Sequence, residues 1–94
     1  MVVGLAIVTL HMHEASSLKD KRSVVKRVTA HLRSKFNVAV AEVDTHDAWG
    51  VITLGVACVS TEAGHAHAVL EKAVRLIEHE RLDAELVDYR VEML

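Results

Sequence analysis

The sequence predicts an α+β fold that repeats a strand–helix–strand unit. Val-rich runs that are apolar at both odd and even positions alternate with segments in which apolar residues recur every three or four positions. Their order along the chain is strand, helix, strand, strand, helix, strand. The 94 residues contain no Pro and no low-complexity linker, so we expect one domain, residues 1–94.

The first expected strand, Val2–His13, is apolar on both faces. One parity holds Val3, Leu5 and Ile7, and the other holds Ala6, Val8 and Leu10. Strands of this kind are covered on both sides, so we expect it in the centre of the sheet.

A helix is expected from Leu18 to Ser34. Ser17 and Asp20 have the spacing of a capping box, in which the two residues hold the helix end reciprocally. An apolar stripe at helical spacing follows, formed by Leu18, Val24, Val25, Val28 and Leu32. This stripe should pack on the sheet.

Two strands should follow, Phe36–Val43 and Trp49–Ser60, joined by a polar hairpin loop at Asp44–Ala48. The second of them is again apolar at both parities, so we expect it in the centre of the sheet beside the first strand.

A second helix and a final strand complete the pattern. Ser60 or Thr61 should cap the helix, Glu62–His79, whose apolar stripe is rich in small residues. The last strand, Glu85–Met93, alternates charged residues with apolar ones, as a half-buried edge strand does. The alternating apolar residues are Val87, Tyr89 and Val91.

Right-handed crossovers close this order into a ferredoxin-like βαββαβ sandwich, a four-stranded antiparallel sheet with both helices on one face. The outer face of the sheet is then apolar over the two central strands. Because monomers seldom expose such a patch, we expect self-association through this face, as a homodimer. The alternative is a patch that polar edge strands break up. A protein-interaction module of this kind is one functional hypothesis.

The charge is unevenly distributed along the chain. From Ser17 to Lys35 there are seven Lys and Arg against the single Asp20, an excess of six positive charges. The remainder has four Lys and Arg against twelve Asp and Glu, an excess of eight negative charges. Such a distribution can steer an anionic partner to one face.

The first helix is therefore the candidate anion-binding or nucleic-acid-binding site. We expect solvent-facing cations there that contact phosphates, with the structural alternative of an ordinary solvated helix face. The candidates are Lys19, Lys21, Arg22, Lys26, Arg27 and Arg33. Cations in the first turn oppose the helix dipole, so stability alone does not explain them.

Evidence for catalysis is weak, and we expect no catalytic residue and no cofactor. His11, His13 and His46 form a remote alternative as the metal site of an enzyme, with surface histidines as the simpler interpretation. Cys58 lies in an apolar run and should be a core residue. The pair Glu42 and Asp44 is too common an arrangement to assign a reaction.

Composition excludes several other classes of protein. A lone cysteine cannot support a disulfide framework, and no apolar stretch approaches the ~20 residues of a membrane span. The first residues lack the features of a signal peptide. We expect a cytoplasmic protein with no membrane partner.

The blocks "SLKDKRSVVKRV", "FNVAVAEVDTHDAWG" and "LGVACVS" resemble the bacterial DUF503, or YlxP-like, family over essentially the whole chain. One departure is Gly50, where Gln is expected in many relatives. The resemblance implies a short ferredoxin-like domain of undefined activity, with genes often near those for translation initiation factor two and ribosome-binding factor A. It implies a role near translation, with ribosomal RNA or a ribosomal particle as partner, and supplies no catalytic residue.

Overall fold

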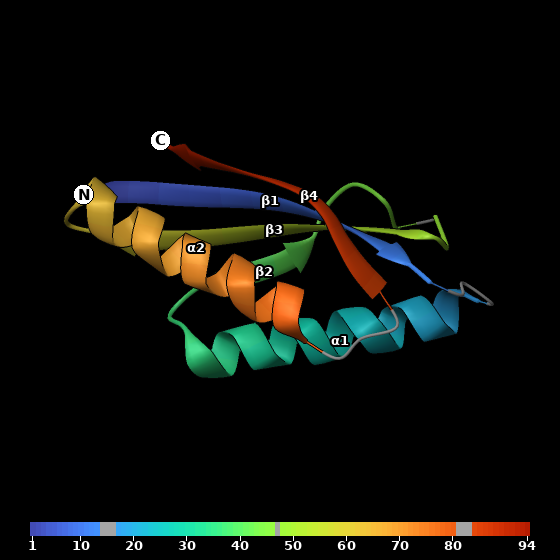
Figure 1. The fold of residues 1–94 in the computed structure, drawn as a ribbon. Helices are drawn as coiled ribbons and strands as arrows, with labels where there is room; N and C mark the ends of the chain where they lie inside the picture. The colour runs from blue at the N-terminus through green and yellow to red at the C-terminus, as the bar shows by residue number, and fades with distance from the viewer. Residues whose placement is uncertain (14–16, 47, 81–83) are drawn as a thin grey trace.

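The computed structural model describes residues 1–13, 17–46, 48–80 and 84–94, and it has the expected order of elements. A four-stranded antiparallel sheet is covered on one face by two helices (Figure 1). The elements are β1 (Val2–Met12), α1 (Leu18–Lys35), β2 (Ala39–Glu42), β3 (Val51–Ser60), α2 (Ala63–His79) and β4 (Ala84–Met93). The strand order β2-β3-β1-β4 confirms the ferredoxin-like prediction, with β1 and β3 in the centre.

The hydrophobic core lies between the sheet and the helices. Alternate residues of the central strands supply one side of it, because successive side chains of a strand point to opposite faces. Its largest contributions from the sheet are Val8 and Leu10 of β1 and Ile52, Leu54 and Val56 of β3. The helices contribute Val24, Val28 and Leu32 of α1 and Ala66, Leu70, Ala73 and Ile77 of α2.

Gly4 of β1 lies against α2. A Cβ atom built on Gly4 would lie 2.9 Å from Leu70 Cδ1 and 3.3 Å from Ala66 Cβ. The small residues of both elements therefore set the distance between this helix and the sheet.

Two predicted strands are shorter than expected. The segment Phe36–Val43 contributes only Ala39–Glu42 to the sheet, because Phe36 caps the C-terminus of α1 and its N–H donates to Leu32 O at 2.9 Å. The strand expected to begin at Trp49 begins at Val51, so Trp49 belongs to the loop.

The N-terminal residue of α2 also differs from the prediction. Glu62, and neither Ser60 nor Thr61, occupies the N-cap position, and its side chain makes no cap hydrogen bond. The Ser60 hydroxyl accepts a hydrogen bond from the Glu62 N–H at 3.2 Å, and Glu62 directly precedes the first helical residue, Ala63.

The predicted alternation of β4 is interrupted by a bulge. Thr9 pairs with Asp88 but the next residue, Leu10, pairs with Leu86, so Val87 has no partner in β1. Val87 is consequently exposed, and Leu86 takes the half-buried position against the core. In the described residues, no helix is long and apolar enough to cross a membrane.

Candidate anion-binding site on the first helix

Helix α1 begins with the expected cap and presents six of its seven cations to solvent. The Ser17 hydroxyl accepts a hydrogen bond from the Asp20 N–H at 3.2 Å, which confirms this half of the predicted capping box. The exposed cations of the helix are Lys19, Arg22, Lys26, Arg27, Arg33 and Lys35. Over the described ranges, no ion pair engages any of these six side chains.

Most of these cations share one side of the helix. At 100° per residue, Lys19, Arg22, Lys26 and Arg33 fall within a narrow stripe, while Arg27 lies farther round the exposed face. The Arg33 guanidinium donates from Nη2 to the Val40 carbonyl at 2.7 Å. Since Val40 belongs to β2, the stripe runs along the side of α1 that borders this edge strand.

Arg33 therefore has a structural contact in addition to its charge. The Val43 N–H donates to Thr53 O, so in the alternating pattern of an antiparallel pair the Val40 carbonyl points away from β3. Arg33 occupies this free carbonyl of the sheet edge. Its guanidinium is thus less available to an anion than the ends of Lys19, Arg22 and Lys26.

Lys21 does not face solvent, and the expectation that it does is wrong. Its side chain is 1% exposed, and Nζ donates to the carbonyls of Thr45 and of Ala48, the latter at 2.6 Å. The reason is its position: Lys21 precedes Val24 by three residues and Val28 by seven, so it continues the buried stripe. That spacing was the signal in the sequence that could have identified it.

Glu42 is the charged partner of Lys21. Its Oε2 lies 2.8 Å from Lys21 Nζ, and the Glu42 side chain is 12% exposed. This oxygen accepts no hydrogen bond from any described residue, so the ion pair is what compensates its burial. Lys21 and Glu42 together fasten the start of α1 to β2 and to the β2–β3 loop.

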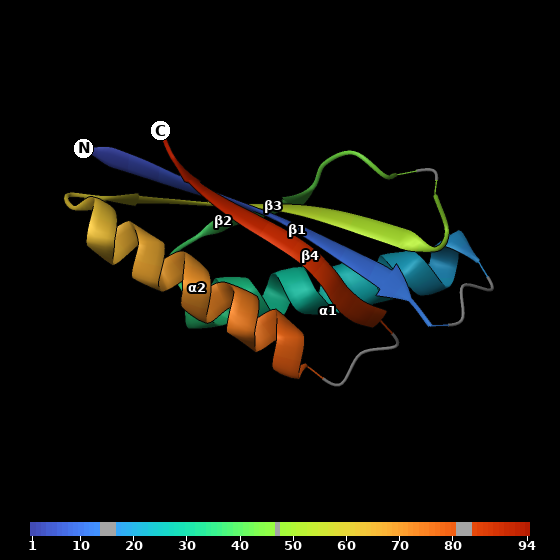
Figure 2. The ribbon, with the colours of Figure 1, turned by 45° about the horizontal axis from the view of Figure 1, so that its top comes forward.

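The β2–β3 loop carries an exposed aromatic side chain that sequence reasoning did not include in the site. Trp49 is 53% exposed and follows Ala48 directly. Both views place this loop at the end of the molecule where α1 begins (Figures 1 and 2). A tryptophan within the polar segment "THDAWG" was the available signal.

The histidines do not assemble a metal site. Within the described residues, which include His11, His13 and His46, no three His, Cys, Asp or Glu side chains are grouped to hold a metal ion. The pair Glu42 and Asp44 is also divided by the fold, since Glu42 is taken up by Lys21 while Asp44 is exposed.

Cys58 is a core residue, as expected. It is 4% exposed, its thiol donates to Ala66 O at 3.6 Å, and burial raises the pKa of the thiol above its usual value. A raised pKa keeps the thiol protonated and makes it a poor nucleophile.

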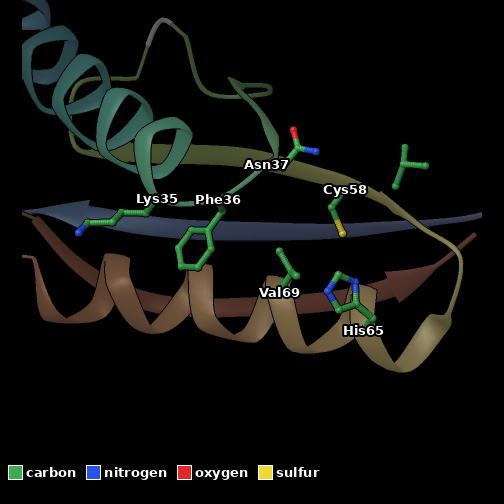
Figure 3. Close-up of a pocket in the computed structure, with 7 residues that line it drawn as sticks. Lys35, Phe36, Asn37, Cys58, His65 and Val69 are labelled. Atoms are coloured by element: carbon green, nitrogen blue, oxygen red, sulfur yellow. The ribbon is translucent and has the colours of Figure 1, made fainter.

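A pocket of about 220 Å³ lies beside Cys58, between α2 and the C-terminal end of α1 (Figure 3). Phe36, Val69 and Cys58 give it apolar walls, and Lys35 is directed away from His65. His65 Nδ1 is already within 3.0 Å of the Ser60 hydroxyl. The lining therefore does not bring its polar groups to a common point, as a catalytic site requires.

The fold and these residues can now be compared with known proteins. A family model described as "Protein of unknown function (DUF503)" matches residues 3–91. The chain belongs to the DUF503 family. The match covers the cationic helix, the Lys21–Glu42 pair and the β2–β3 loop, so these features lie within the DUF503 domain itself.

One relative is the uncharacterized protein YlxP of Bacillus subtilis (strain 168). It is 31% identical over 77 residues, which cover 82% of this DUF503 chain and 84% of YlxP. Two designed proteins have similar solved structures. Foldit4 has a TM-score of 0.56 at 17% identity, covering all of this chain and 97% of its own. The ferredoxin-fold design LFR1 1 has a TM-score of 0.54 at 16% identity, covering all of this chain and 83% of its own. At these identities the designs show the fold alone.

Proposed function

We propose that this DUF503 protein binds RNA, as ribosomal RNA or within a ribosomal particle, through the exposed cations of α1. The observation that carries the proposal is a row of cations on one helix face that no described acid neutralises. Lys19, Arg22 and Lys26 form the row and Arg27 flanks it. Lys21 takes no part in this contact because it is buried.

The physical basis is the release of counterions from the RNA backbone. Each phosphate neutralised by a Lys or Arg releases condensed cations, and for single strands log K falls with log salt by about 0.7 per phosphate. Three phosphate contacts would give a slope of about −2. Because the rest of the chain is acidic, binding should be confined to this helix.

The test is co-sedimentation with ribosomal particles at about 50 mM and about 200 mM salt. We expect the wild-type protein to co-sediment at low salt and to dissociate at high salt. The variant Lys19→Glu/Arg22→Glu/Lys26→Glu should lose binding and keep its circular dichroism spectrum, since all three side chains are exposed.

A matched control reverses three exposed cations elsewhere, as Lys72→Glu/Arg75→Glu/Arg90→Glu. It changes the net charge by the same amount but leaves α1 intact, so it should bind as the wild-type protein does. Equal loss in both variants would show that total charge decides, and retained binding in the α1 variant would refute the proposal.

A second proposal is a homodimer formed through the outer face of the sheet. Both helices lie on the other face, and the outward positions of the central strands are apolar cross-strand pairs. Val3 pairs with Val59, Leu5 with Ala57 and Ile7 with Gly55. Val59 is 64% exposed, a high value for a side chain in a central strand.

Sedimentation equilibrium over a dilution series tests the dimer. We expect Val59→Lys to shift the wild-type dimer to monomer, because it places a charge on the apolar face beside Val3. Val87→Lys adds the same charge on exposed edge strand β4 and should leave the dimer intact. A wild-type monomer at all concentrations would overturn this proposal without affecting the first.

A further inference from the structure

Two aromatic side chains of the described residues are exposed, Trp49 and Tyr89, and they differ in their surroundings. Tyr89 donates its hydroxyl to Glu71 Oε2 at 3.0 Å, and this carboxylate raises the pKa of Tyr89. Trp49 instead follows Ala48, whose carbonyl accepts a hydrogen bond from Lys21 of α1. The Glu71 carboxylate would repel an anion near Tyr89.

Trp49 is exposed on backbone that is fixed on both sides. The preceding carbonyl, of Ala48, accepts from Lys21 Nζ at 2.6 Å, and the following carbonyl, of Gly50, accepts from the Met12 N–H at 2.9 Å. The loop is tied further by Thr45, whose hydroxyl accepts from the Thr53 N–H at 2.9 Å. Backbone held in this way at Ala48 and Gly50 presents the indole at little further entropic cost on binding.

The same anchor ties the loop that carries Trp49 to the first turns of α1, which also hold the exposed cations Lys19 and Arg22. A single Lys21 side chain bridges the first turns of the helix and the carbonyl adjoining Trp49, and Arg22 is the next residue along. Among the described residues of α1 and of the β2–β3 loop, the exposed acids are Asp20 and Asp44, while the charge of Glu42 is compensated by Lys21. A phosphate chain on Lys19 and Arg22 would thus lie at the same end of the molecule as the indole (Figures 1 and 2).

We propose that Trp49 stacks on an unpaired base of single-stranded RNA whose phosphates contact the α1 row. This inference rests on the proposed RNA binding and assigns it a substrate class. Bases stack on aromatic side chains whatever their sequence, whereas a duplex hides the faces of its bases. The contact lies at the loop end of the sheet and not on the sheet face, whose central strands have no aromatic residue.

Trp49 is the only tryptophan of the chain, so its fluorescence reports directly on the proposed contact. The full chain is titrated with a single-stranded RNA of about twelve nucleotides and with an RNA duplex of the same phosphate number. We expect the single strand to quench the fluorescence and the duplex to leave it unchanged. Quenching by both, or by neither when binding is measured independently, would overturn the stacking proposal.

Affinity measurements on variants separate stacking from phosphate binding. Trp49→Ala should weaken single-strand binding about tenfold and leave the salt slope and duplex binding unchanged. Trp49→Phe should restore part of the loss, and Tyr89→Ala, which removes the other exposed aromatic ring, should bind as the wild-type protein does.

The two proposals fail in different ways. If Trp49→Ala binds both RNAs normally while the α1 charge reversal abolishes binding, stacking is overturned and phosphate binding stands. If wild-type protein binds neither RNA at low salt, both proposals are overturned. A fluorescence change produced by a purified ribosomal protein and by no RNA would overturn the inference in favour of a protein partner.

Discussion

Lys21 buries an ammonium group in a small domain, where each unpaired charge is costly. Its Nζ donates hydrogen bonds to two loop carbonyls, of Thr45 and Ala48, and lies 2.8 Å from Oε2 of the negatively charged Glu42. Replacing one partner leaves the other buried without compensation, which costs about 3–5 kcal/mol, whereas replacing both can be nearly neutral.

We therefore expect Lys21→Met to lower the free energy of unfolding by about 3–5 kcal/mol, measured by urea denaturation. The double variant Lys21→Met/Glu42→Leu should recover most of this loss, because no unpaired charge remains. A single variant as stable as the wild-type protein would show that the pair contributes nothing. Lys26→Met, an exposed lysine of the same helix, is the control and should change stability little.

At the residue scale, local rules were predictable from the sequence and remote partners were not. The Ser17 cap was found because it depends on residues three apart. Lys21 was placed in solvent by its residue type, although its spacing put it in the buried stripe. Its partner Glu42 lies 21 residues later, and only the fold brings the two together.

At the element scale, the approach of α2 to β1 depends on Gly4. Gly4→Val should destabilise the protein by roughly 1–3 kcal/mol, because its added methyl groups enter space that Leu70 and Ala66 already occupy. Gly64→Ala is the matched control, since nothing lies within 4 Å of its added Cβ and it favours the helical backbone. It should raise stability by about 0.4–1 kcal/mol in the same denaturation experiment.

The outcome in which both variants behave alike would contradict this account. Equal destabilisation would mean that glycine itself matters at both positions, and two neutral variants would mean that α2 moves freely on the sheet.

Strand boundaries were the least predictable feature at this scale. The bulge at Val87 arises from the pairing of β4 with β1, so the alternation within Glu85–Met93 could not reveal it. The start of β3 was misplaced for a similar reason. Tryptophan is common in strands, so the sequence favoured a strand at Trp49. The neighbouring carbonyls of Ala48 and Gly50 instead accept hydrogen bonds from Lys21 and from the Met12 N–H, and Trp49 lies in the loop.

At the scale of the whole molecule, the two proposed surfaces do not compete. The cations of α1 lie on the helical side of the sheet and the apolar pairs of β1 and β3 on the other. A dimer formed through the sheet would therefore carry two outward-facing cationic helices. It would present two RNA sites at a fixed separation, which favours a large or folded RNA over a short one.

The order of the sheet has a consequence for synthesis on the ribosome. The central strand β1 is made first, yet Gly4 pairs with Met93 and the Leu94 N–H donates to Val3 O at 2.8 Å. Until β4 leaves the exit tunnel, β1 keeps an open edge and Leu70 and Ala66 lack part of their final packing. Such distant pairing slows folding, so the domain keeps an unpaired strand edge and a tendency to aggregate until β4 has been synthesised.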